Sequence, residues 1–320
     1  MRSRTQTETR LLSTIIKHAP LTASELARLT GYSRSWVWKT LRRMEKDNII
    51  RLEKQGGALI VHPHTNFYKR LLRIGILRAS EYPYILPFAK KLRDLYSNVE
   101  IIVYDEAFKL AYDIALGRLH LGFAPAISHL IVHRVSGGLS YIIGGGSRGG
   151  AGVVEGKSGR GHITTMASTM ELCAEVKKLE PPRMYARKGE VILENVLNGK
   201  ARYGVIWEPY LYLARRKGLH TEDCGLPFCC LLGGNAGILS ERETIKKALS
   251  KAMEEASRRL RDPVFIEAYS SLVGLDKNLV ANTFLSYEFL HEPPLEELKS
   301  LLKFMKNVAF PDWILREAVL

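Results

Sequence analysis

The chain has 320 residues, of which 46% are hydrophobic and 25% are charged, and its formal net charge is +14. A chain of this length and apolar content can bury substantial cores, which excludes disorder of the whole chain. The length predicts two domains, or one two-lobed domain with an appendage. The positive charge favours a polyanionic partner.

The excess positive charge is concentrated in the first part of the sequence. Residues 1–65 contain 12 Lys and Arg against 5 Asp and Glu, which gives them +7 of the total of +14. Charges of both signs alternate over the later helical segments, as is typical of solvated helix faces. A nucleic-acid site is therefore expected in the N-terminal part.

Residues 1–8 are polar, and no apolar stretch is long enough to cross a membrane, so we expect a cytoplasmic protein with no membrane partner. The cysteines show no C-x-x-C spacing, and the last two lie in an apolar run typical of a buried strand. We expect buried thiols rather than metal ligands, with no metal site and no cofactor. The cysteines are Cys173, Cys224, Cys229 and Cys230.

Three helices are predicted at the N-terminus. Apolar residues at helical spacing, Leu11, Leu12, Ile15 and Ile16, indicate the first helix. A T-x-x-E capping box at Thr22 and Glu25 begins a second, short helix that ends at Gly31. Ser33 caps a third helix, whose inward positions are Val37, Leu41 and Met44.

After Asn48 the hydrophobic period changes to two, which predicts a β-hairpin turning at residues 54–57. Three helices followed by a β-hairpin are typical of a winged helix-turn-helix, which we expect over residues 1–65. The segment LTASELARLTGYSRSWVWKTLRRMEKDNIIRL, residues 21–52, resembles the winged helix of MarR-like and ArsR-like regulators, and the resemblance covers residues 7–62. It implies binding to double-stranded DNA.

The outward face of the third helix is polar and basic, and it supplies the candidate DNA contacts. Sequence readout is expected mainly from Arg34, Ser35 and Lys39, and phosphate contacts from Arg42 and Arg43. The full set, with one lysine at the tip of the wing, is Ser33, Arg34, Ser35, Trp38, Lys39, Arg42, Arg43 and Lys54. The alternative is a winged helix that binds protein. Either Trp36 or Trp38 packs under the wing.

Residues 66–71 form a short linker, and residues 72–320 form the second domain. Strand-like and helical segments alternate from residue 71 onward: strand 71–77, helix 85–96, strand 99–104, helix 108–116 and strand 119–123. This alternation predicts a parallel α/β sheet. The glycine-rich passage at residues 144–165 is expected to be a flexible crossing between two lobes. Helices at 242–261, 264–272, 279–291 and 295–305 are expected to form a helical C-terminal region.

Three segments resemble the type 2 periplasmic-binding-protein fold, and specifically its sulfonate, nitrate and pyrimidine-precursor binding family. They are ALGRLHLGFAPAISH at 115–129, IIGGGSRGGAGVV at 142–154 and NGKARYGVIWEPY at 198–210. The resemblance covers residues 72–290 and implies a two-lobed domain with Trp207 and Glu208 in a ligand pocket. The acidic residue that the family has before the last strand is replaced by Arg202 and Tyr203, which leaves the class of ligand open.

Open α/β sheets bind ligands beyond the carboxyl ends of their strands, and helix N-termini there favour anions. The candidate ligand-binding residues at these positions are Ser80, Glu81, Tyr82, Pro125, Ala126, Ser128, Gly146, Ser147, Ser168, Thr169, Trp207 and Glu208. For the serines and threonines, helix capping is an equal alternative. His129 and His133 lie four residues apart, but no third ligand is evident, so a structural role is favoured over metal binding.

The sequence therefore predicts a homodimeric, ligand-responsive transcription regulator that binds an anionic or heterocyclic metabolite between two lobes. The first alternative is an enzyme of cofactor or pyrimidine-precursor biosynthesis, and DNA binding is compatible with it. Pyrimidine-precursor synthases and chorismate-type dehydratases have a similar two-lobed fold, and the Cys229 and Cys230 pair resembles the cysteine-rich motif of the synthases. However, no nucleophile, base and orienting residue form a recognisable set. The second alternative is a non-catalytic scaffold.

Overall fold

The computed structural model describes residues 6–47, 49–55, 57–63, 71–305, 308, 310–311 and 313–320. The chain divides into two compact units, residues 1–72 with 94–98 and residues 73–93 with 99–320. We call them the N-terminal unit and the C-terminal unit. Of the predicted linker, residues 66–70 lie outside the described residues.

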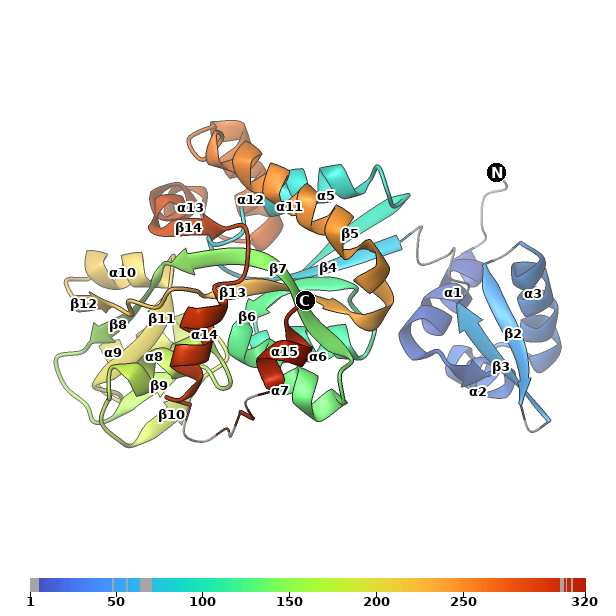
Figure 1. Ribbon diagram of the computed structural model, residues 1–320, viewed down its shortest axis with the longest axis horizontal. Helices are drawn as coiled ribbons and strands as arrows, with labels where there is room; N and C mark the ends of the chain where they lie inside the picture. Colours follow the sequence, from blue (N-terminus) through green and yellow to red (C-terminus); the bar gives the residue numbers. More distant parts are fainter. Residues whose placement is uncertain are drawn as a thin grey trace. The chain divides into compact units, whose positions relative to one another are not determined.

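The N-terminal unit contains three helices and a small antiparallel sheet (Figure 1). Its elements are α1 (Gln6–His18), β1 (Leu21–Thr22), α2 (Ala23–Thr30), α3 (Arg34–Lys46), β2 (Ile50–Gln55) and β3 (Ala58–Pro63). The strand order is β1-β3-β2. The predicted inward residues Val37, Leu41 and Met44 are buried with Leu11 and Ile15 in one apolar core.

The predicted helix signals of this unit are confirmed. The Thr22 Oγ1 accepts a hydrogen bond from Glu25 N–H at 3.1 Å, and Glu25 Oε2 accepts one from Thr22 N–H at 2.7 Å. Gly31, with φ of 75°, ends α2 in the left-handed region that favours glycine. The hairpin prediction was too wide, because Lys54 and Gln55 are still paired with Leu59 and Ala58.

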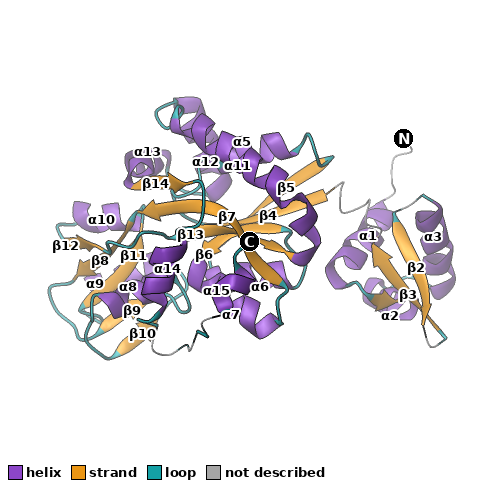
Figure 2. Cartoon of the chain, viewed as in Figure 1, coloured by secondary structure: helices purple, strands orange, loops and turns teal. Residues whose placement is uncertain are grey.

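The C-terminal unit has two lobes, each built around its own sheet (Figures 1 and 2). The six-stranded sheet of the first lobe has the order β14-β7-β13-β6-β4-β5. Its strands are β4 (Leu71–Leu77), β5 (Asn98–Tyr104), β6 (Leu121–Pro125), β7 (Ser140–Gly149), β13 (Cys230–Asn235) and β14 (Tyr287–Leu290). The second lobe's sheet has the order β10-β9-β11-β8-β12. Its strands are β8 (Ala151–Glu155), β9 (His162–Thr164), β10 (Arg183–Tyr185), β11 (Tyr203–Trp207) and β12 (His220–Asp223).

Helices pack against both sheets. Those before β13 are α5 (Ile85–Leu92), α6 (Ala107–Ala115), α7 (Ala126–Ser136), α8 (Thr169–Val176), α9 (Gly189–Leu197) and α10 (Tyr210–Arg216). The helical C-terminal region contains α11 (Arg242–Ser257), α12 (Pro263–Val273), α13 (Lys277–Thr283), α14 (Leu295–Leu302) and α15 (Ile314–Ala318). None of the described helices combines the length and the apolar content needed to span a membrane.

The prediction of a parallel sheet is confirmed for β4 and β6 but not for the whole sheet, because both sheets are mixed. β4 pairs with β6 in parallel, but β13 pairs antiparallel with both β6 and β7. The glycine-rich passage does cross between the lobes, because it joins β7 of the first lobe to β8 of the second. However, its glycines lie in strands rather than in a loop. Gly144 to Gly149 belong to β7, and a Cβ on Gly146 would collide with the carbonyl oxygen of Cys230. Glycine there allows β7 to approach β13 closely.

Two further predictions are corrected. The helix expected at 279–291 ends at Thr283, and residues 287–290 form β14, because this segment pairs with the edge of β7. Of the four expected buried thiols, Cys173 in α8 and Cys224 after β12 form a disulfide, with 5.5 Å between their Cα atoms. The fold brings together two cysteines that are 51 residues apart in sequence.

Candidate functional site

The outward face of α3 carries exposed polar and basic side chains. Ser33 begins the helix by accepting a hydrogen bond from Trp36 N–H at 3.3 Å. The exposed candidates on α3 and its cap are Ser33, Arg34, Ser35, Trp38, Lys39, Arg42 and Arg43. The eighth candidate, Lys54, is exposed within β2 rather than at the tip of the wing. The structure therefore brings seven of the eight residues together on one helix.

Two of these arginines are held by other side chains. Arg42 forms an ion pair with Glu45 at 3.0 Å and stacks over Trp38, 4.7 Å from the ring centroid. Arg43 pairs with Glu8 of α1. Within the described part of the chain, no ion pair involves Arg34 or Lys39, so these cations are available to a polyanion.

The two tryptophans of α3 have different surroundings. Trp36 packs on the core of the unit and lies 4.6 Å from Tyr32 between ring centroids. Trp38 is 43% exposed on the basic face. Trp36 is thus the packing residue, and Trp38 remains on the surface with the cations.

In the C-terminal unit, a cavity of about 280 Å³ lies between the two lobes. An aromatic wall is formed by Phe108 from the first lobe and by Tyr185, Trp207 and Tyr210 from the second. Met166 and Met170 add apolar surface. The indole Nε1 of Trp207 donates a hydrogen bond to the carbonyl oxygen of Arg78 at 3.3 Å, which links the two lobes.

Four predicted ligand-binding residues line this cavity: Glu81, Pro125, Ser168 and Trp207. Ser168 also caps α8, accepting hydrogen bonds from Met170 N–H and Glu171 N–H. The other candidates lie outside the described lining: Ser80, Tyr82, Ala126, Ser128, Gly146, Ser147, Thr169 and Glu208.

The candidates outside the lining are buried, and the serines, the threonine and Glu208 among them are hydrogen-bonded within the protein. Ser128 Oγ donates to the Ala167 carbonyl oxygen at 2.6 Å, and Thr283 Oγ1 donates to Ser80 Oγ at 2.7 Å. Glu208 accepts hydrogen bonds from Tyr212 N–H at 2.7 Å and from Arg215 at 2.9 Å. Burial raises the pKa of Glu208, although both donors oppose the shift. Its contacts assign Glu208 to α10 rather than to the cavity.

Sequence reasoning missed most of the charged and aromatic lining. Asp105 and Glu106 follow β5, and Tyr185 ends β10 with residues 186–190 after it. Both positions are at strand carboxyl ends, so the rule that found Glu81 and Pro125 would have found them once these strands were placed. Cys229 and Cys230 also line the cavity, but nothing in their spacing indicated it.

The charges at the mouth of the cavity are paired. Arg78 donates to Asp105 at 2.7 Å within the first lobe. Two pairs connect the lobes: Glu106 with Arg187 at 3.4 Å, and Asp105 with Lys188 at 3.7 Å. The hydrogen bond from Arg78 lowers the pKa of Asp105. The mouth therefore presents little uncompensated charge.

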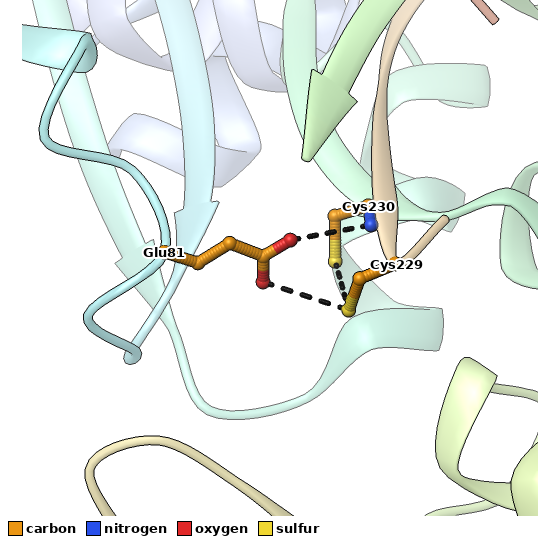
Figure 3. Close-up of side chains that lie close together, drawn as sticks. All are labelled: Glu81, Cys229 and Cys230. Atoms are coloured by element: carbon orange, nitrogen blue, oxygen red, sulfur yellow. Dashed lines mark hydrogen bonds between the residues drawn. The ribbon is translucent and has the colours of Figure 1, made fainter. Parts of the chain in front are cut away.

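Glu81, Cys229 and Cys230 form a buried cluster at the inner end of the cavity (Figure 3). Cys229 Sγ lies 3.6 Å from Cys230 Sγ and 3.7 Å from Glu81 Oε2. Cys230 N–H and Ser147 Oγ–H both donate to Glu81 Oε1. Burial raises the pKa of Glu81 and, more strongly, that of Cys230. The hydrogen bond with Cys230 lowers the pKa of Cys229, but burial and Glu81 together raise it above its ordinary value.

Comparison with known proteins identifies the fold of each unit. Residues 4–51 match a family model described as winged helix-turn-helix DNA-binding. The N-terminal unit is a winged helix-turn-helix. A comparison with curated proteins finds no match.

The rest of the chain is similar to solved binding proteins. The ligand-binding component of an ABC-type import system from Staphylococcus aureus, solved with zinc bound, is 14% identical with a TM-score of 0.62, over 78% of this chain and 96% of that one. The alkanesulfonate-binding protein SsuA from Xanthomonas axonopodis pv. citri, bound to MOPS, is 14% identical with a TM-score of 0.62, over 78% of this chain and 98% of that one. The periplasmic aliphatic sulphonate binding protein SsuA from Escherichia coli is 13% identical with a TM-score of 0.61, over 78% of this chain and 92% of that one. The C-terminal unit thus has the two-lobed fold of periplasmic binding proteins, and at these identities the likeness shows the fold alone.

Proposed function

We propose that this chain is a transcription regulator that binds double-stranded DNA through α3 and a small effector in the cavity between the lobes. The observation that carries the proposal is the combination in one chain: a winged helix with an exposed basic helix, followed by a binding-protein fold with an interlobe cavity. A protein that works with DNA belongs in the cytoplasm, and we propose that location.

In this proposal α3 is the recognition helix. Recognition helices enter the major groove with their N-terminal residues at base edges. Arg34, Ser35 and Lys39 are placed for base contacts, and Arg42 and Arg43 for phosphates. A winged helix that binds protein instead has less support, because the exposed face is cationic.

The cavity favours a planar, heterocyclic effector over a strongly anionic one. Its walls are aromatic, and Arg78, Arg187 and Lys188 at its mouth are already paired with carboxylates. The lining also carries a few polar side chains, among them Glu81 and Ser168. Cavities that bind small molecules combine apolar walls with a few polar groups in this way.

Effector binding regulates DNA binding if it changes the arrangement of two winged helices. Operators for winged helices contain two half-sites, one for each subunit, so we propose a homodimer. An effector that binds the closed lobes better than the open ones shifts the equilibrium toward the closed form. DNA affinity then changes by the coupling free energy between the two sites.

The test is a fluorescence polarisation titration of the full chain with DNA from its own promoter, at two salt concentrations and with a panel of metabolites. The proposal expects sequence-preferring binding that weakens steeply with salt and changes with one compound. Absence of any DNA preference contradicts it. If a panel compound is chemically converted, the enzyme alternative holds; if none binds and DNA is ignored, the scaffold alternative holds.

A further inference from the structure

The cluster of Glu81, Cys229 and Cys230 has the ligand types and the spacing of a metal site. Each residue offers one ligand atom, and the three atoms lie within 4.8 Å of one another. Neighbouring residues in a regular strand point to opposite faces. Cys229 lies in a bend directly before β13, which lets both thiols converge on one point (Figure 3).

The distances match those between two ligands of one tetrahedral ion. With metal–sulfur bonds of about 2.3 Å and metal–oxygen bonds of about 2.0 Å, two sulfurs lie about 3.8 Å apart and a sulfur and an oxygen about 3.5 Å apart. The corresponding distances here are 3.6 Å between the two sulfurs and 3.7 Å between Cys229 Sγ and Glu81 Oε2. Little rearrangement is needed to place an ion between these atoms.

The surroundings hold the three ligands in position. Ser147 Oγ–H and Cys230 N–H occupy Oε1 of Glu81, which leaves Oε2 facing Cys229. Thr169 Oγ1 donates to the Cys229 carbonyl oxygen at 3.0 Å and so fixes the bend. Hydrogen bonds of this kind orient ligands in metal sites.

From this geometry we infer that Glu81, Cys229 and Cys230 bind a thiophilic divalent cation of the zinc class at the inner end of the interlobe cavity. On binding, the two thiols release their protons to solvent. The two thiolates and the Glu81 carboxylate then carry three negative charges against the two positive charges of the ion. The remaining negative charge is stabilised by the hydrogen bonds that Ser147 Oγ–H and Cys230 N–H donate to Glu81 Oε1. Three protein ligands leave one tetrahedral position for water or for a donor atom of a molecule in the cavity.

The ion deepens the proposed function, and any role in sensing rests on that function. A ring nitrogen of a heterocyclic effector is a suitable fourth ligand. Binding of the ion itself requires only the C-terminal unit's own residues. The two proposals can therefore be tested separately.

The experiment is a titration of the reduced, metal-free full chain with Co²⁺, followed by displacement with Zn²⁺. We expect one ion per chain, with a thiolate-to-cobalt charge-transfer band and the intense visible bands of tetrahedral cobalt. Cys229→Ser or Cys230→Ser should remove most of the charge-transfer intensity and weaken binding by more than about 100-fold. Ser147→Ala, which removes only a hydrogen bond to Glu81, should retain the band and weaken binding by about 10- to 100-fold.

The matched control is C173S/C224S, which removes the other two cysteines and should leave the titration unchanged. Circular dichroism shows whether each variant is folded, and the wild-type titration decides the question even if a variant is not. The inference is overturned if the wild type shows no charge-transfer band, or if the band survives when both Cys229 and Cys230 are serine. If the chain binds Co²⁺ but not DNA, the metal site stands and the proposed regulator function is contradicted. If it binds DNA but not Co²⁺, only the metal site is contradicted.

Discussion

His120, which is buried directly before β6, gives the stability of the C-terminal unit a pH dependence. Its Nδ1 accepts a hydrogen bond from Arg73 N–H at 3.0 Å, and burial lowers its pKa from 6.5 to about 4. Between these values the unfolded chain takes up a proton that the folded chain does not. Stability is therefore lost as the pH falls through this window, by about 2 kcal/mol from pH ~7 to pH ~5 for this residue.

The substitution His120→Asn isolates this contribution. Asparagine keeps an oxygen near the position of Nδ1 to accept the Arg73 hydrogen bond, but it does not titrate. Urea unfolding at both pH values should show a smaller loss of stability in the variant than in the wild type, by about 2 kcal/mol. Equal losses in the two proteins would show that His120 is protonated in the folded state.

At the scale of an element, substitutions at two positions of α3 should distinguish residues that contact bases from residues that contact phosphates. Arg34→Ala should weaken the free energy of binding to the preferred DNA by about 1–3 kcal/mol and relax the sequence preference, because an arginine in the first turn is placed at base edges. Arg42→Ala should weaken binding to all DNA sequences alike, and it should reduce the number of counterions released on binding by about one, as read from the salt dependence of the affinity. Lys200→Ala, on the C-terminal unit, is the control. Equal loss on all sequences for Arg34→Ala would contradict the assigned orientation of α3.

Elements with local causes could be predicted from the sequence. The capping box at Thr22, the cap at Ser33 and the helical spacing of Val37, Leu41 and Met44 all act within a few residues, and the structure confirms them. The general fold of both units followed from such patterns and from resemblance. The aromatic cavity wall did not, because it combines residues from several strand ends.

Features that depend on distant partners could not be predicted. Cys173 and Cys224 meet only because α8 packs near the end of β12. Glu81 and Cys230 are 149 residues apart. The segment 287–290 has helical spacing but pairs with β7, so tertiary contacts override its local preference. The glycines of β7 look like a loop until the close approach of β13 is known.

At the scale of the whole C-terminal unit, weak forces hold the lobes together at the cavity mouth. The pairs Glu106–Arg187 and Asp105–Lys188 are solvent-accessible, with Arg187 80% exposed and Lys188 55% exposed. Exposed pairs are worth about 0–1 kcal/mol each and are screened by salt. A bound effector can therefore supply enough free energy to change the closure of the lobes.

Trp207 can report this closure, because its indole donates to the Arg78 carbonyl oxygen on the opposite lobe. Raising the salt from about 0.05 M to about 1 M should screen the mouth pairs and shift the emission of Trp207 toward that of a hydrated indole. The variant E106Q/K188M should show this shifted emission already at low salt. E288Q, which removes the exposed pair of Glu288 with Arg148 within the first lobe, should behave as the wild type. The Trp207→Phe variant emits only through the other three tryptophans, Trp36, Trp38 and Trp313. Subtracting its spectrum from that of the wild type therefore leaves the emission of Trp207. An emission that ignores both salt and the double variant would mean that aromatic packing, rather than the mouth pairs, sets the closure, and that an effector must break that packing to move the lobes.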